Sequence, residues 1–105
     1  MPKTVAKSPA KTKTVPYDVA EQLRTPEEMA AYLDAWLTEA PEDAAGIARA
    51  LGDIARARGM SQVARDAGLS RESLYKALSE NGNPSFATIL KVARALGLRL
   101  HAKAA

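Results

Sequence analysis

The sequence contains no cysteine and few aromatic residues. Without cysteine the chain can form neither disulfides nor thiolate metal sites, and this usage fits a reducing cytosol. Aromatic residues are only 5% of the chain, whereas alanine and leucine dominate a hydrophobic fraction of 47%, a mixture that favours helices over strands. No apolar run approaches the ~20 residues that a membrane helix needs, and the basic N-terminus lacks the apolar stretch of a secretory signal. We therefore expect one helical domain in the cytoplasm, with no membrane segment.

Groups suited to catalysis or metal binding are also scarce. The single histidine, His101, is among the last residues, where a surface position is more common than a catalytic one. The six glycines are scattered, so there is no glycine-rich phosphate loop. The acidic pairs Glu27-Glu28 and Glu42-Asp43 stand at predicted helix starts, where carboxylates stabilise the positive end of the helix. The sequence therefore predicts no enzyme, no metal site and no cofactor.

The net charge of +3 conceals three segments of different sign. Residues 1–16 hold four lysines and no acid, residues 17–58 hold four basic against nine acidic side chains, and residues 59–105 hold seven basic against three acidic. A basic stretch suits a polyanion, and an acidic stretch suits a basic partner. Residues 1–16 lack any apolar period, so we expect a disordered basic tail followed by a folded domain over residues 17–101.

Hydrophobic spacing and capping signals predict an all-α domain of about five helices, with an extra capped helix at its N-terminal end. The capping box of that helix is Thr25-Pro26-Glu27-Glu28. The expected helices begin near Thr25, Pro41, Ser61, Arg71 and Ser85. The expected buried faces comprise Met29, Leu33, Trp36, Leu37 and Ala40 in the first helix, Ile47, Ala48, Leu51, Ile54 and Ala55 in the second, and Phe86, Ile89, Leu90, Ala93 and Leu96 in the last. The alternating segment Leu98–His101 could form a short strand, provided that it finds a partner.

The run VARDAGLSRESLYKAL, residues 63–78, has the spacing of a helix-turn-helix. Gly68 can take the positive φ that the turn requires, and Ala64 is small where the two helices approach. Ser70 is a good N-cap for the second helix. A plain helical hairpin is the alternative interpretation of this pattern.

The second helix of this motif carries several polar side chains, and they cannot all face the core. Arg71 and Lys76 can donate to guanine, and Glu72 can accept from cytosine or orient a neighbouring arginine. The hydroxyl groups of the set suit phosphate contacts, which fix register but not sequence. We therefore predict a recognition helix that begins at Ser70 and enters the major groove of DNA. Its predicted DNA contacts are Ser70, Arg71, Glu72, Ser73, Tyr75 and Lys76.

Two longer stretches resemble known families. VARDAGLSRESLYKAL followed by NPSFATILKVARALGL resembles the phage-repressor class of helix-turn-helix domain. YDVAEQLRTPEEMAAYLDAWL followed by IARALGDIARARGMSQVARDAGLSRESLYKALS resembles the HigA-like addiction module antidote antitoxins, over roughly residues 17–101. This resemblance implies a homodimeric, nucleoid-associated bacterial antitoxin that binds its own promoter and neutralises a small RelE/ParE-like ribonuclease toxin.

One position departs from the repressor class. Many such domains begin the first helix of the motif with a glutamine that contacts phosphate. That position is Met60 here, and Gln62 lies out of register. Ser61 is therefore added to the predicted DNA contacts as the residue that substitutes for the glutamine.

The acidic segment around residues 18–43 is the candidate toxin surface, because RNA-cleaving toxins tend to be basic. Glu28, Tyr32 and Asp34 are its predicted contacts, with Tyr32 exposed while Met29 and Trp36 pack into the bundle. Dimerisation is expected to use the last helix and the segment Leu98–His101. Two alternatives remain: a phage or mobile-element repressor without a toxin partner, and a helical adaptor that binds only protein.

Overall fold

The structure is a computed structural model, and it describes residues 19–79 and 81–104. All regular structure in these residues is helical, so the predicted all-α fold with five α-helices is confirmed. The elements are the 3-10 helix η2 (Val19–Gln22) and the α-helices α2 (Pro26–Glu39), α3 (Ala44–Arg58), α4 (Met60–Ala67), α5 (Arg71–Ala77) and α6 (Phe86–Ala95). The predicted basic tail, residues 1–16, lies outside the described residues. No helix in the described part of the chain is long and apolar enough to cross a membrane.

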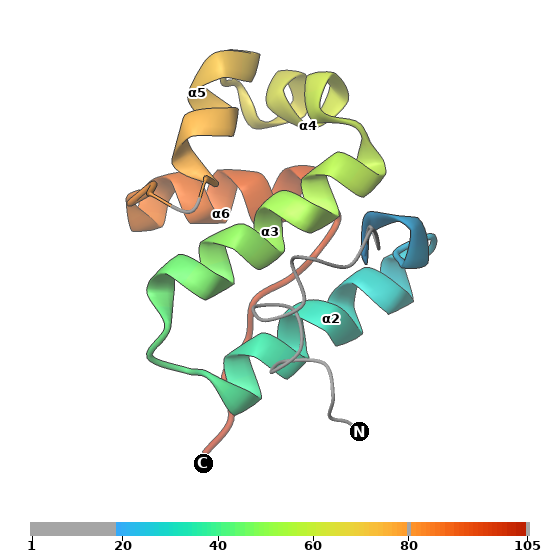
Figure 1. The fold of residues 1–105 in the computed structure, drawn as a ribbon, viewed down its shortest axis with the longest axis vertical. Helices are drawn as coiled ribbons and strands as arrows, with labels where there is room; N and C mark the ends of the chain where they lie inside the picture. Colours follow the sequence, from blue (N-terminus) through green and yellow to red (C-terminus); the bar gives the residue numbers. More distant parts are fainter. Residues whose placement is uncertain (1–18, 80, 105) are drawn as a thin grey trace.

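Helix α3 forms the middle of the molecule. It contacts η2 and α2 on one side and α4 on the other, while α4 also packs on α5 and α6. Figure 1 shows the result: α4 and α5 stand at one end of the molecule, and α2 lies at the other, beyond α3. The largest fully buried side chains come from α3 to α6 and the residue after α6: Leu51, Ile54, Val63, Leu74, Val92 and Leu96.

The helix starts follow the predicted capping signals. Thr25 accepts a hydrogen bond from the Glu28 amide at 3.1 Å, and the Glu28 carboxylate accepts one from the Thr25 amide at 2.9 Å, which confirms the capping box. Helix α3 begins at Ala44 rather than at Pro41, because the Asp43 carboxylate caps it by accepting from the amide of Gly46 at 2.8 Å.

A close approach at Gly46 fixes α2 on α3. A Cβ at this position would lie 2.5 Å from Cζ3 of Trp36 and would also collide with the Asp43 carboxylate. Trp36 is 3% exposed, and the guanidinium carbon of Arg49 lies 5.8 Å from the centre of its ring. The absence of a side chain at Gly46 therefore allows the indole to lie directly against the backbone of α3.

Three predicted core positions are wrong. Leu37 is 41% exposed, Phe86 is 70% exposed and Leu90 is 46% exposed. The apolar stripes of α2 and α6 are wider than the surfaces that neighbouring helices cover, so the edge of each stripe stays in solvent.

The short strand predicted at Leu98–His101 is also wrong. These residues have no regular structure, and no strand is assigned anywhere in residues 19–79 and 81–104. Instead, Gly97 takes a φ of 76° and the amide of Leu98 donates to the Ala93 carbonyl at 2.9 Å. The segment therefore closes the carboxyl end of α6, as in a Schellman motif, and Leu98 packs against the core.

Replacement of Gly46 by alanine tests the close approach. Alanine favours the helix by about 1 kcal/mol relative to glycine, whereas overpacking costs about 1–3 kcal/mol. We expect Gly46→Ala to lower the free energy of unfolding by up to about 2 kcal/mol, which is the overpacking cost less the helix gain, because the buried Trp36 ring cannot move away freely. Urea denaturation measures this change. In a Trp36→Leu background the same substitution should cost less, and an equal cost in both backgrounds would remove the indole as the cause.

Candidate nucleic-acid interface

The turn between α4 and α5 has the predicted conformation. Gly68 has φ 74° and ψ 30°, in the left-handed region that glycine adopts without steric cost. The Leu69 amide donates to the Ala64 carbonyl at 2.8 Å, and the Gly68 amide donates to the Arg65 carbonyl at 3.1 Å. These two bonds form a Schellman motif, which ends α4 and redirects the chain into the next helix.

Ser70 then caps α5. Its hydroxyl oxygen accepts a hydrogen bond from the Ser73 amide at 2.9 Å, and the same hydroxyl donates to the Ser73 side-chain oxygen at 2.8 Å. One turn further on, Leu74 has no exposed surface and anchors the helix in the core. The cap and the anchor together decide which face of α5 points outward.

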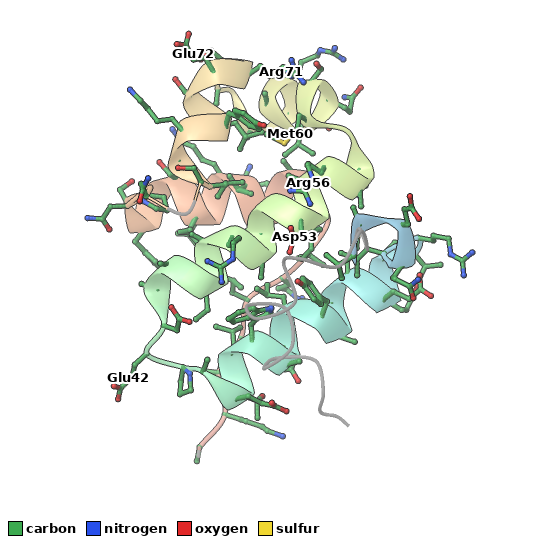
Figure 2. All side chains as sticks on the ribbon, viewed as in Figure 1. Glu42, Asp53, Arg56, Met60, Arg71 and Glu72 are labelled. Carbon is green, nitrogen blue, oxygen red and sulfur yellow. The ribbon has the colours of Figure 1, made fainter. Side chains whose placement is uncertain are left out.

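The outward face carries the side chains that were predicted to contact DNA. Tyr75 is 65% exposed, and Figure 2 shows Glu72 at the outer end of α5 with Arg71 near the α4–α5 junction. The predicted contacts on α5 and its cap are all exposed: Ser70, Arg71, Glu72, Ser73, Tyr75 and Lys76.

An open hollow of about 470 Å³ lies between α4, α5 and the end of α3. It brings together three predicted contacts, Ser61, Arg71 and Tyr75, which come from two different helices. The other predicted contacts on α5 are not part of its lining. The full lining is Ala20, Arg56, Gly59, Met60, Ser61, Gln62, Arg71 and Tyr75.

In the first turn of α4, Met60 occupies the position at which many repressor-class domains carry a phosphate-contacting glutamine. Met60 is half-buried and packs against the core, whereas Ser61 is exposed. The Gln62 amide nitrogen donates to Asp66 at 2.9 Å, and its oxygen accepts from Arg65 at 2.9 Å. Gln62 is thus held along the surface of α4 by its own neighbours, and Ser61 is the exposed hydroxyl of α4 that lines the hollow.

Arg56 and Gln62 also line the hollow; Arg56 is not among the contacts predicted from the sequence, and Gln62 is set aside there as out of register. Figure 2 shows Asp53, Arg56 and Met60 following one another along the end of α3 towards α4. The Arg56 guanidinium donates to the Asp53 carboxylate at 2.9 Å and remains 44% exposed. The available signal was the pair Arg56 and Arg58, which stands in an otherwise acidic segment directly before the motif. Arg58 has a structural partner, because it donates to the Leu96 carbonyl at 3.1 Å.

Tyr32 is not an exposed partner contact, so its predicted placement is wrong. The side chain is 9% exposed, and its hydroxyl donates to the second carboxylate oxygen of Asp53 at 2.7 Å. Burial raises the pKa of Tyr32 above its usual value, and the hydrogen bond to Asp53 raises it further. Asp53 therefore joins α2 to the end of α3 that borders the hollow.

The other two predicted partner contacts lie on the surface of α2. Asp34 is exposed, and Glu28 is exposed while its carboxylate accepts from the amides of Arg24 and Thr25. These two bonds, with that of Arg24 the stronger, lower the pKa of Glu28. Figure 2 places Glu42 at the end of the molecule opposite Arg71 and Glu72. The exposed acids of this region are Glu21, Glu27, Glu28, Asp34, Glu39, Glu42 and Asp43.

A family model described as "Probable addiction module antidote protein" matches residues 13–104. The chain belongs to this family of antidote proteins. An uncharacterized protein of Haemophilus influenzae is 59% identical over 83 residues, which are 79% of this chain and 84% of that protein. No solved structure matches the chain significantly.

Membership in an antidote family implies a toxin as partner, and a small helical fold agrees with a binding role. Within the described residues of this antidote, no group of three or more histidine, aspartate or glutamate side chains is arranged to hold a metal ion.

Because of the buried hydrogen bond between Tyr32 and Asp53, the free energy of unfolding of the antidote should fall as the pH rises through the alkaline range. The unfolded tyrosine ionises near pH ~10, while the buried one stays protonated, so the stabilising contribution is present below that pH and is lost as the pH rises. Tyr32→Phe should lower the free energy of unfolding by about 1–2 kcal/mol at pH 7 and flatten its decline above pH ~10. Tyr75→Phe, which removes an exposed phenol, is the control. Parallel pH curves for the wild type and Tyr32→Phe would contradict this assignment.

Proposed function

We propose that this chain is the antitoxin of a type II toxin–antitoxin module, which neutralises a toxin and represses its own operon by binding DNA. The family match supports the antitoxin role. The DNA-binding role is carried by one observation: a capped, core-anchored α5 that turns Arg71 and its neighbours outward beside Ser61 of α4. The proposed site of action is the bacterial cytoplasm, at the nucleoid.

In the proposed complex α5 enters the major groove. Arg71 and Lys76 donate to guanine, and Glu72 accepts from cytosine or orients Arg71. Ser61 and Tyr75 contact phosphates along the hollow, where Arg56 adds positive charge. A homodimer would place two such helices about 34 Å apart, which is one turn of a palindromic operator.

The proposed toxin surface is the outer face of α2. Asp34 and Leu37 are three residues apart and share a face of the helix, so an exposed carboxylate stands beside an exposed apolar side chain. A basic, RNA-cleaving toxin of the RelE/ParE-like class fits this combination, because opposite charges steer the encounter and the apolar contact adds affinity.

Co-expression with the neighbouring gene product tests the antitoxin role. The tagged chain should retain that product through purification and relieve its toxicity in growing cells. Asp34→Lys should weaken the complex by about 1–2 kcal/mol, because it places a cation opposite the basic toxin. Glu72→Lys makes the same change of charge on α5 and should leave toxin binding intact. If the chain retains no neighbouring gene product, the antitoxin role is contradicted. If both variants lose the same affinity for the toxin, the proposed toxin surface on α2 is contradicted.

A mobility shift on the DNA directly upstream of the gene tests the recognition helix. Arg71→Ala should cost about 1–3 kcal/mol on that DNA, a loss of about 5- to 150-fold, with a smaller loss on a random duplex. Arg24→Ala is the control: it removes the same single positive charge as Arg71→Ala, but at the residue before the α2 capping box, and this variant should bind the DNA as the wild type does. Equal losses of Arg71→Ala on both duplexes would remove Arg71 from the set of base-reading residues.

A further inference from the structure

The hollow between α4, α5 and the end of α3 is positively charged. Its lining holds two cations, Arg56 and Arg71, and no acidic side chain. The hydroxyl groups of Ser61 and Tyr75 add further donors, so the set as a whole suits an anion that presents several oxygens. A phosphate group of a nucleic acid is such an anion.

The position of the hollow also suits a DNA backbone. If α5 enters the major groove as proposed, then α4, the first helix of the motif, crosses the sugar–phosphate backbone. The hollow lies between these two helices, so a backbone strand would pass over it. Arg71 is assigned to a base in the proposed complex, and the other cation of the lining is Arg56.

The turn at Gly59 brings Arg56 to this place from outside the motif. Gly59 has a φ of 114°, a value that favours glycine, and it separates the last turn of α3 from the first turn of α4. Figure 2 shows Arg56 between Asp53 and Met60, at the end of α3 that meets α4. A residue three positions before the turn thus lines the same hollow as residues of α4 and α5.

Arg56 is held by a contact chain that leads into the protein. One carboxylate oxygen of Asp53 accepts from the Arg56 guanidinium at 2.9 Å, and the other accepts from the Tyr32 hydroxyl at 2.7 Å. The side chain of Asp53 is 15% exposed and that of Arg56 is 44% exposed. The inner end of the chain is therefore fixed by packing, while its outer end reaches the solvent.

We propose that Arg56 binds a backbone phosphate of the operator from this hollow, and that Asp53 is the residue that positions it. A guanidinium carries five N–H donors in a planar fork, so it can hold a carboxylate on one edge and a phosphate on another. A long side chain loses much rotamer freedom when it binds, and a guanidinium that is oriented beforehand loses less. The inference rests on the proposed DNA binding and adds to it a contact from α3.

The charge of Asp53 makes the positioning role distinguishable from a simple charge effect. A carboxylate beside a polyanion opposes binding, so its removal should strengthen DNA binding if charge alone matters. If Asp53 positions Arg56, its removal should weaken DNA binding instead. The sign of the effect therefore decides between the two.

DNA binding at several salt concentrations tests the phosphate contact. Arg56→Ala should weaken binding to the upstream DNA and to a random duplex by the same factor, about 3- to 10-fold, and should reduce the salt dependence by about 0.9, the value for one phosphate. Arg24→Ala removes the same charge outside the lining of the hollow and should change neither quantity. An unchanged salt dependence in Arg56→Ala, or a loss confined to the upstream DNA, would overturn the contact.

The positioning role is tested by Asp53→Asn in two backgrounds. An amide of the same shape has lost the charge and one of the two acceptor oxygens. In the wild-type background this variant should weaken DNA binding about threefold and reduce the salt dependence, a quantity that a loss of stability alone would not move. In the Arg56→Ala background it should strengthen DNA binding, because only the charge effect remains. Stronger binding in both backgrounds would overturn the positioning role.

Tyr32→Phe decides the case in which Asp53→Asn does not fold by circular dichroism. It keeps both charges and removes only the hydrogen bond that holds the inner oxygen of Asp53. DNA binding should weaken about twofold in the wild-type background and stay unchanged in the Arg56→Ala background. Equal losses in the two backgrounds would show that Tyr32 acts through stability alone and would overturn the contact chain.

These measurements also separate the inference from the proposed function. If the wild type binds neither duplex, the proposed DNA binding fails and the inference fails with it. If the wild type binds the upstream DNA and Arg56→Ala binds it with the same affinity and salt dependence, the inference fails and the proposed function stands.

Discussion

The burial of Leu74 is the interaction on which the proposed DNA-binding surface depends. Helix α5 has seven residues, and a helix of that length is not stable on its own in water. It exists because Leu74 is fully buried and Leu78, its C-cap, is 4% exposed. A Cβ at Gly52 of α3 would lie 3.1 Å from the Leu78 carbonyl oxygen, so α3 and the end of α5 are in close contact. The outward direction of Glu72 and Lys76 follows from this inward anchor, since each is two residues from Leu74 and therefore lies on the opposite face of the helix.

Helix α3 supports both proposed binding surfaces. At its start Gly46 admits the Trp36 ring of α2, and near its end Asp53 accepts hydrogen bonds from Tyr32 of α2 and from Arg56 at the hollow. The carboxylate thus orients an arginine beside the proposed DNA surface while it holds the helix that carries the proposed toxin surface. Asp53 thus contacts elements of both proposed surfaces, so its replacement would change the packing of α2 on α3 as well as the charge near Arg56.

The parts of the structure that the sequence predicts well are those decided by neighbouring residues. The Thr25 capping box, the left-handed Gly68 and the Ser70 cap each depend on side chains within four positions, and all three are present. Burial on a helix face depends instead on what another element covers. For that reason the sequence places Phe86 in the core, although no other part of the described chain covers it. It likewise places Tyr32 in solvent, although the carboxylate of Asp53, 21 residues away, accepts a hydrogen bond from its hydroxyl. Arg56 was missed for the same reason, because only the fold brings it beside Arg71.

The separation of the two surfaces has a consequence for how toxin and operator would compete. Helix α2, which carries exposed acids, lies at one end of the molecule and α5 at the other, with α3 between them (Figure 1). A toxin confined to the outer face of α2 would leave α5 uncovered, and the two proposed ligands could then bind one chain together. An effect of such a toxin on the proposed repression would then act at a distance, for example through the added charge of the toxin or through the contact of Tyr32 with Asp53.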